Sequence, residues 1–121
     1  MNSIKLALMG LALGSAATFA GDCTPPELPS LADGSTASMD DMLAGQKAVK
    51  TFQAANLEYM GCLDPQIAAA ADAANADSAS DADKATVKQL EELYNTAVSK
   101  EEELAGQFNT EIREYKAANP S

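Results

Sequence analysis

Between residues 39 and 63, apolar side chains recur at the spacing of an amphipathic helix. Two interleaved sets repeat every seven residues, with one polar intrusion at Asn56, which is the heptad pattern of packed helices. The sets are Met42, Val49, Asn56 and Leu63, and Gly45, Phe52 and Tyr59. Ser38 is a good N-cap, and Asp40 and Asp41 place negative charge at the positive end of the helix dipole. The pattern predicts a helix that begins directly after Ser38.

Asp64-Pro65 interrupts this pattern. Proline fits the first turn of a helix but not its interior, because it lacks an N–H and clashes with the preceding turn. The alanine-rich stretch 66–76 continues the helical tendency, with Ile67 as its only large apolar residue. We expect a first arm that runs to Ala76 with a kink near Asp64-Pro65. The pattern leaves open whether this arm is one kinked helix or two helices.

A second amphipathic helix is predicted from about Ala82 to Ala117. Its apolar positions are Val87, Leu90, Tyr94, Ala97, Leu104, Phe108, Ile112 and Tyr115, and Glu101 falls on the same stripe. The polar segment 77–80 indicates a tip loop, after which Ser80 or Asp81 caps the helix. At ~1.5 Å per residue the arms are about 57 Å and about 54 Å long. Matched arms around a short loop predict an all-α fold, an antiparallel helical hairpin over residues 38–117.

Folding the chain about residues 78 and 79 sets the register of the two arms. The facing positions are Leu63 with Tyr94, Val49 with Phe108, Met42 with Tyr115, and Asn56 with Glu101. An amide donor beside a carboxylate is a pair that can satisfy its hydrogen bonds. We therefore predict a polar pair in the seam, Asn56 and Glu101, that fixes the alignment of the arms as buried Asn does in coiled coils, in preference to a ligand role.

Residues 1–20 have the layout of a cleaved signal peptide. Lys5 gives a short charged region, residues 6–13 an apolar one, and residues 14–20 supply small side chains before a cut. The apolar run is well short of the ~20 residues of a spanning helix. A lipid anchor on Cys23 is disfavoured because Asp22, and not a small residue, precedes it. We expect a periplasmic or secreted protein with no transmembrane segment after cleavage.

Residues 21–37 are predicted to form an extended strap. Three prolines (Pro25, Pro26 and Pro29) favour a polyproline path, and Asp33-Gly34 marks a turn. Leu28 and Leu31 are placed to cover the groove of the hairpin as a third layer. Residues 118–121 are expected to be disordered.

Cys23 and Cys62 are the only cysteines, and in an exported protein we expect them to form a disulfide. Cys62 lies ~35 Å along the first arm from its start. The residues between Cys23 and Ser38 span about 46 Å in a polyproline path. The strap therefore reaches Cys62 by doubling back along the first arm.

The acidic composition narrows the partners. The whole chain carries a net charge of −10, and removing residues 1–20 takes away Lys5 and no acid, which leaves −11. Nucleic acid and anionic lipid are disfavoured as partners, because both require positive charge. Alanine is abundant, tryptophan is absent, and runs of Val, Ile and Thr are missing, which favours one small helical domain.

The residue types disfavour an enzyme, a cofactor or a metal. The chain has no histidine, the commonest general base and transition-metal ligand. Asp77, Asp81 and Asp83 lack the glycine and glutamate of a calcium loop, and helix capping explains them better. Met39 and Met42 are assigned to packing and not to copper. In the run 101–103 the three glutamates point in different directions, so they form no paired catalytic site.

Residues 23–63, a third of the chain, resemble a known group of proteins. The residues concerned are Cys23, Pro25, Pro29, Asp33-Gly34, Ala37-Ser38, Met42, Val49, Phe52, Tyr59 and Cys62-Leu63. They are similar to those of small, exported, uncharacterised proteobacterial proteins with a signal peptide, a cysteine, a Pro-rich stretch ending near Asp-Gly, and a helical Tyr-x-x-Cys-Leu. Members tend to have proline before Asp-Gly, where this chain has Ala32. The resemblance implies export and a two-cysteine frame, and no activity.

Three functions fit these features. The first is a non-enzymatic, envelope-associated interaction protein that uses a long acidic helical surface. The second is an inhibitor or immunity-type protein against a cationic secreted enzyme such as a lysozyme, which the net negative charge of the chain suggests. The third is a holdase-like chaperone, which needs an exposed apolar patch. A two-helix hairpin buries little surface by itself, which leaves a homodimer open.

Overall fold

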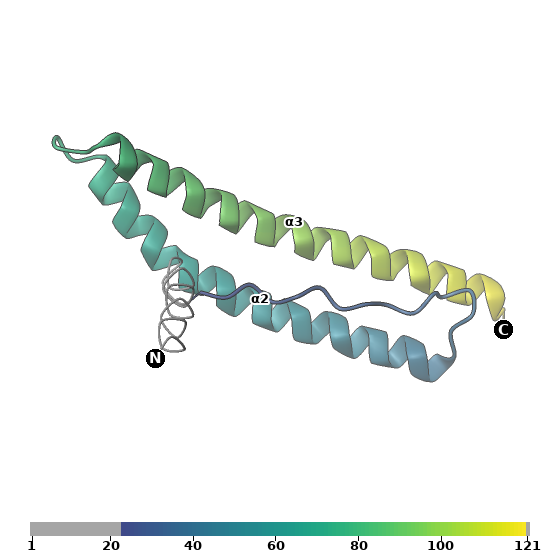
Figure 1. Cartoon of the computed structure of the whole chain (residues 1–121). Helices are drawn as coiled ribbons and strands as arrows, with labels where there is room; N and C mark the ends of the chain where they lie inside the picture. The colour runs from purple at the N-terminus through teal and green to yellow at the C-terminus, as the bar shows by residue number, and fades with distance from the viewer. Residues whose placement is uncertain (1–22, 121) are drawn as a thin grey trace, which may run out of the picture.

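A computed structural model describes residues 23–120, so the predicted signal peptide lies outside the described part. Two long helices, α2 (Met39–Ala74) and α3 (Asp81–Ala118), pack against each other as an antiparallel hairpin (Figure 1). No strand occurs among the described residues. The all-α hairpin predicted from the heptad pattern is confirmed.

The same local motif starts both helices. The Ser38 Oγ accepts a hydrogen bond from the Asp41 N–H at 3.1 Å, and the Asp41 carboxylate accepts one from the Ser38 N–H at 3.1 Å. Ser80 and Asp83 repeat this exchange at 3.2 and 3.0 Å. These capping boxes satisfy amides that have no partner within the helix, so each start is encoded locally. Ser80, and not Asp81, is the cap of α3.

The first arm is one continuous helix with Pro65 inside it. The ring of Pro65 removes the amide that would bond to the Gly61 carbonyl and crowds that carbonyl. Figure 1 shows α2 changing direction on its way to the tip. The arm ends at Ala74, two residues before the predicted limit, where the Asn75 N–H bonds to the Ala71 carbonyl at 3.0 Å.

The second arm extends slightly beyond its predicted end. Ala118 is helical, and the Asn119 N–H donates to the Tyr115 carbonyl at 2.9 Å while its side-chain amide donates to the same oxygen at 3.0 Å. Ala118 therefore belongs to α3, and the disorder expected over residues 118–121 stays a prediction. Ser121 lies outside the described residues.

The buried side chains form two clusters along the seam between the helices. The cluster nearer the tip contains Cys23, Tyr59, Leu63, Leu90 and Ala97. The cluster nearer the open end contains Val49, Phe52 and Leu104, with Leu31 and Phe108 partly buried against it. Asn56 lies between the two and is 2% exposed. The core is thus a narrow line of residues, which is what two helices alone can bury.

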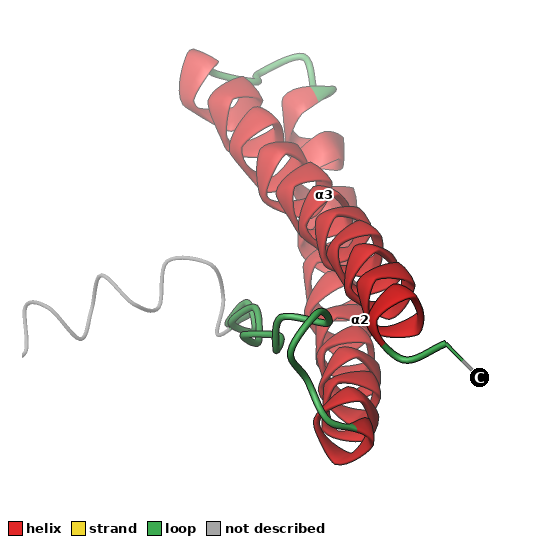
Figure 2. Ribbon diagram, turned by 90° about the vertical axis from the view of Figure 1, so that its right-hand side faces the viewer, coloured by secondary structure: helices red, strands yellow, loops and turns green. Residues whose placement is uncertain are grey.

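The strap runs along one side of the hairpin, from the middle of α2 to the open end (Figures 1 and 2). Cys23 is bonded to Cys62 of α2, as predicted. Leu31 packs against the cluster nearer the open end, whereas Leu28 is 38% exposed and does not cover the groove. Prolines hold the strap extended, so only some of its side chains face the helices.

Candidate functional site

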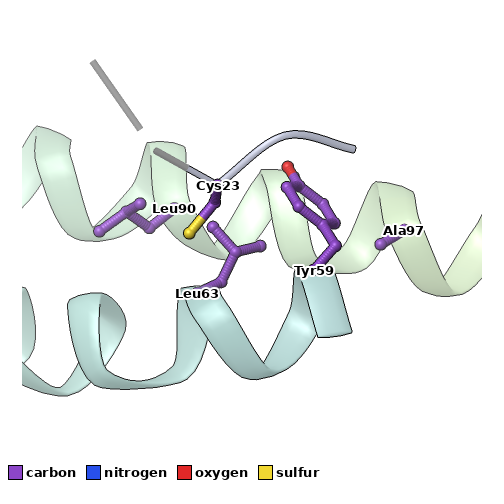
Figure 3. Close-up of a cluster of buried hydrophobic side chains, with 5 residues drawn as sticks. All are labelled: Cys23, Tyr59, Leu63, Leu90 and Ala97. Atoms are coloured by element: carbon purple, nitrogen blue, oxygen red, sulfur yellow. The ribbon is translucent and has the colours of Figure 1, made fainter. Parts of the chain in front are cut away.

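The disulfide lies in the apolar core. The Cα atoms of Cys23 and Cys62 are 5.7 Å apart, and Cys23 is 7% exposed. Figure 3 shows Cys23 from the strap among Tyr59 and Leu63 of α2 and Leu90 of α3. Burial raises the pKa of the Tyr59 hydroxyl above its ordinary value. Both cysteines are used in the bond, so it fastens the strap and offers no thiol for chemistry.

The seam polar pair meets as the register predicted. The Asn56 Nδ2 donates to Glu101 Oε1 at 3.0 Å and to the Ala97 carbonyl at 3.0 Å. Both hydrogens of the amide therefore have acceptors on α3. The geometry links one position of α2 to one turn of α3, and its role in fixing the alignment stays a prediction.

Three carboxylates gather where the strap meets α3. Oxygens of Asp33, Glu111 and Glu114 lie within 4.8 Å of one another. The Gly34 N–H donates to Glu111 Oε1 at 2.7 Å, and the Ser35 N–H and Oγ donate to Asp33 Oδ1 at 3.0 and 2.7 Å. Hard cations such as Ca²⁺ take carboxylate ligands. Here two of the three carboxylates already accept hydrogen bonds from the turn. The cluster is therefore explained by its structural role, which is to hold the turn of the strap against α3.

Within this cluster the pKa values of Asp33 and Glu114 are shifted in opposite directions. The Glu111 carboxylate, followed by burial and Asp33, raises the pKa of Glu114 above its ordinary value. The hydrogen bonds from Ser35, side chain first and backbone second, lower the pKa of Asp33. The heptad pattern does not predict this cluster. Glu111 and Glu114 share a face of α3, and the cluster forms only because the strap places Asp33 beside that face.

The residues considered for metals lie apart. Asp81 and Asp83 are in the first turn of α3, where Asp83 completes the capping box, and Asp77 is in the tip loop. Met42 is buried at 9% exposure, but Met39 is 56% exposed, so packing does not explain Met39. Within the described residues, Asp77, Asp81 and Asp83 do not belong to the cluster of acids that could hold a metal ion.

The side of the hairpin away from the strap carries two neighbouring hollows between the helices, which we call the open groove. The first, about 260 Å³, is lined by Gln53, Met60, Val98, Glu101, Glu102 and Ala105. The second, about 400 Å³, is lined by Asp64, Ile67, Glu91, Tyr94 and Asn95. The lining residues include four carboxylates and no lysine or arginine.

Helical spacing makes the two hollows one surface. Gln53, Met60, Asp64 and Ile67 follow one another along a single flank of α2. Leu57 lies on the same flank and is 69% exposed, and Val98 on α3 is 37% exposed. The heptad pattern does not predict this surface, although Leu57 and Val98 are large apolar residues off the seam stripe and are the signal for it.

The strap side has a hollow of its own. It measures about 410 Å³ and is lined by Pro26, Glu27, Pro29, Ala44, Lys47, Ala48, Thr51, Phe52 and Ala55. Its lining includes one acid, Glu27, and one base, Lys47, so it has no single charge preference. The two sides of the hairpin therefore differ in charge as well as in cover.

No protein-family model, curated protein or solved structure matches this chain. Within residues 23–120, neither helix combines the length and apolar character needed to cross a membrane.

Proposed function

We propose that this protein is a non-enzymatic, exported interaction module that binds another protein or an envelope component of the periplasm or the exterior. The observation that carries the proposal is the contrast between the two sides of the hairpin. One side carries the strap, while the other presents the open groove, beside which Leu57 on the same flank of α2 is 69% exposed. Exposed apolar groups within a polar rim are typical of protein contact surfaces.

The frame around the groove supports a binding role. Two capping boxes, a buried disulfide and the Asn56 hydrogen bonds hold α2 and α3 in place. A groove held in its final shape binds at a lower entropic cost than a flexible one. The polar side chains of Asn56 and Glu111 are engaged in structural hydrogen bonds.

Site-specific photo-crosslinking in the native host tests this function. A photoreactive amino acid is placed at Leu57, on the flank of α2 that borders the groove, or at Glu58, which is exposed on the neighbouring face of α2. We expect a reproducible crosslinked partner from position 57 and none from position 58. Expression of the disulfide-bonded protein without a partner from either position would count against an interaction module.

An inhibitor of a cationic secreted enzyme is the second candidate, and the four carboxylates of the open groove favour it. Lysozyme activity is measured with and without the purified protein at low and moderate salt. Inhibition that weakens with salt is the expected result, because exposed charges are screened. Unchanged lysis at both salt concentrations removes this candidate.

A further inference from the structure

We infer that the open groove binds an amphipathic α-helix of a partner, with lysine or arginine beside an apolar stripe. This inference rests on the proposed function and adds the chemistry of the partner. Three features of the groove carry it: its length, its apolar floor and its charge.

The length of the groove suits a helix. From Gln53 to Ile67 the groove follows fourteen residues of α2, which is ~21 Å at 1.5 Å per residue. A helix of about fourteen residues has the same length, and packed beside two antiparallel helices it completes a three-helix arrangement. On the opposite side the strap already occupies this third position.

The groove offers apolar contacts at the spacing that a helix presents. Met60 of α2 and Val98 of α3 line the same hollow, and the exposed Leu57 lies three residues before Met60 on the flank of α2 beside it. An apolar stripe on an entering helix would cover these side chains. Met60 has a flexible side chain, which adapts to different partner residues.

The charge of the groove selects a cationic partner. Asp64 and Glu91 line one hollow, Glu101 and Glu102 line the other, and no basic side chain lines either. Lysine and arginine can lay their apolar stems on the floor and extend their charged ends to these carboxylates. A second copy of this chain would instead place carboxylates against carboxylates, so the groove disfavours a homodimer.

A synthetic peptide provides the test. The probe is an 18-residue leucine–lysine peptide with leucines at helical spacing, and its control is a scrambled peptide of the same composition without an apolar face. Fluorescence anisotropy measures binding to the purified, disulfide-bonded protein, and circular dichroism measures helix formation. We expect the patterned peptide to bind and become helical, and the scrambled peptide to bind at least about tenfold more weakly.

Variants locate the binding on the groove. Glu91→Gln with Glu102→Gln is expected to weaken binding about tenfold or more, and Leu57→Ser is expected to weaken it too. The matched control is Glu58→Gln with Glu92→Gln, which removes the same charge from exposed positions that do not line the groove. It should leave binding within about twofold of the wild type.

Several outcomes would overturn the inference. Equal binding of the scrambled peptide, or equal weakening by the control variant, would show attraction to overall charge. Sedimentation equilibrium that finds a dimer which Leu57→Ser dissociates would assign the groove to a second copy. If a partner crosslinks at position 57 but the peptide does not bind, the proposed helical ligand is refuted and the interaction function stands. If no partner crosslinks, the interaction function itself is refuted.

Discussion

The two ends of the strap are held in different ways. At one end Cys23 is covalently bonded to Cys62 of α2 within the apolar core. At the other end the turn after Asp33 lies on α3, where the buried Gly34 donates its N–H to Glu111. The strap therefore joins both arms, one by a covalent bond and the other by close backbone contact.

Close contact at the second end depends on glycine. A Cβ added at Gly34 would overlap the backbone carbonyl of Glu111, so no other residue fits this approach without a shift. The disulfide can be predicted from the presence of two cysteines. The contact of Gly34 with the backbone of Glu111 cannot be predicted from the residue types alone. The non-covalent end of the strap therefore depends on the close fit of one glycine against α3.

Removal of the disulfide is expected to have the largest effect. Cys23→Ala with Cys62→Ala opens a loop with a sequence separation of 39 and should lower the free energy of unfolding by up to ~4 kcal/mol in the chain-entropy model. Urea unfolding followed by circular dichroism measures this change. Reduction of the wild type should reproduce it, and unchanged stability after complete reduction would show that the covalent end is dispensable.

Gly34→Ala tests the non-covalent end. The added methyl group forces the turn away from α3, and we expect a loss of about 1–3 kcal/mol in unfolding free energy. Gly106→Ala is the matched control, because a Cβ there has open space in the middle of α3 and should stabilise the helix by up to ~1 kcal/mol. Changes of the same sign in both variants would contradict the close approach at Gly34.

The seam pair lies between the two ends and tests how far α2 and α3 align without the strap. Asn56→Ala is expected to cost about 1–2 kcal/mol, because it leaves the Glu101 carboxylate and the Ala97 carbonyl without this donor. Asn56→Leu with Glu101→Leu should be as stable as the wild type or more so, but with several alignments. Urea unfolding and the number of NMR amide peaks measure these results. A single set of peaks in the double variant would refute the alignment role.

The smallest effect is expected from pH at the non-covalent end. The pKa of Glu114 is raised in the folded protein, so its contribution is favourable below the unfolded value of 4.5 and is lost as the pH rises through the folded value. At neutral pH an ionised Glu114 faces Glu111 and Asp33. Glu114→Gln should therefore raise the melting temperature slightly at pH 7 and leave it nearly unchanged at pH 3.

Asp33, in the same cluster, should change the stability with pH in the opposite direction to Glu114. Its pKa is lowered by Ser35, so its contribution is present above the unfolded value of 3.8 and is lost as the pH falls through the folded value. Asp33→Asn should lower the melting temperature at pH 7 and have less effect at pH 3. Equal shifts from Asp33→Asn and Glu114→Gln at pH 7 would refute the opposed roles.

Much of the fold follows from local patterns in the sequence. Ser38 and the heptad from Met42 to Leu63 specify where α2 begins and which face it buries, because capping and periodicity depend on neighbouring residues. The register of the arms follows from the tip loop, which brings Asn56 to Glu101. The open groove does not follow, since it depends on how α2 and α3 are rotated against each other. The contact of Gly34 with Glu111 joins residues 77 apart and depends on the complete hairpin.

The disulfide also determines how the molecule responds to proteases. Cys23 and Cys62 close a ring that contains the strap and the first two-thirds of α2. The strap is the extended and largely exposed segment, the kind of chain that proteases enter most readily. A single cut there opens the ring and leaves the protein in one covalent piece. A cut in the tip loop between Ala74 and Asp81 instead separates the two arms, so the disulfide holds the fragments together after a cut in the strap but not after a cut at the tip.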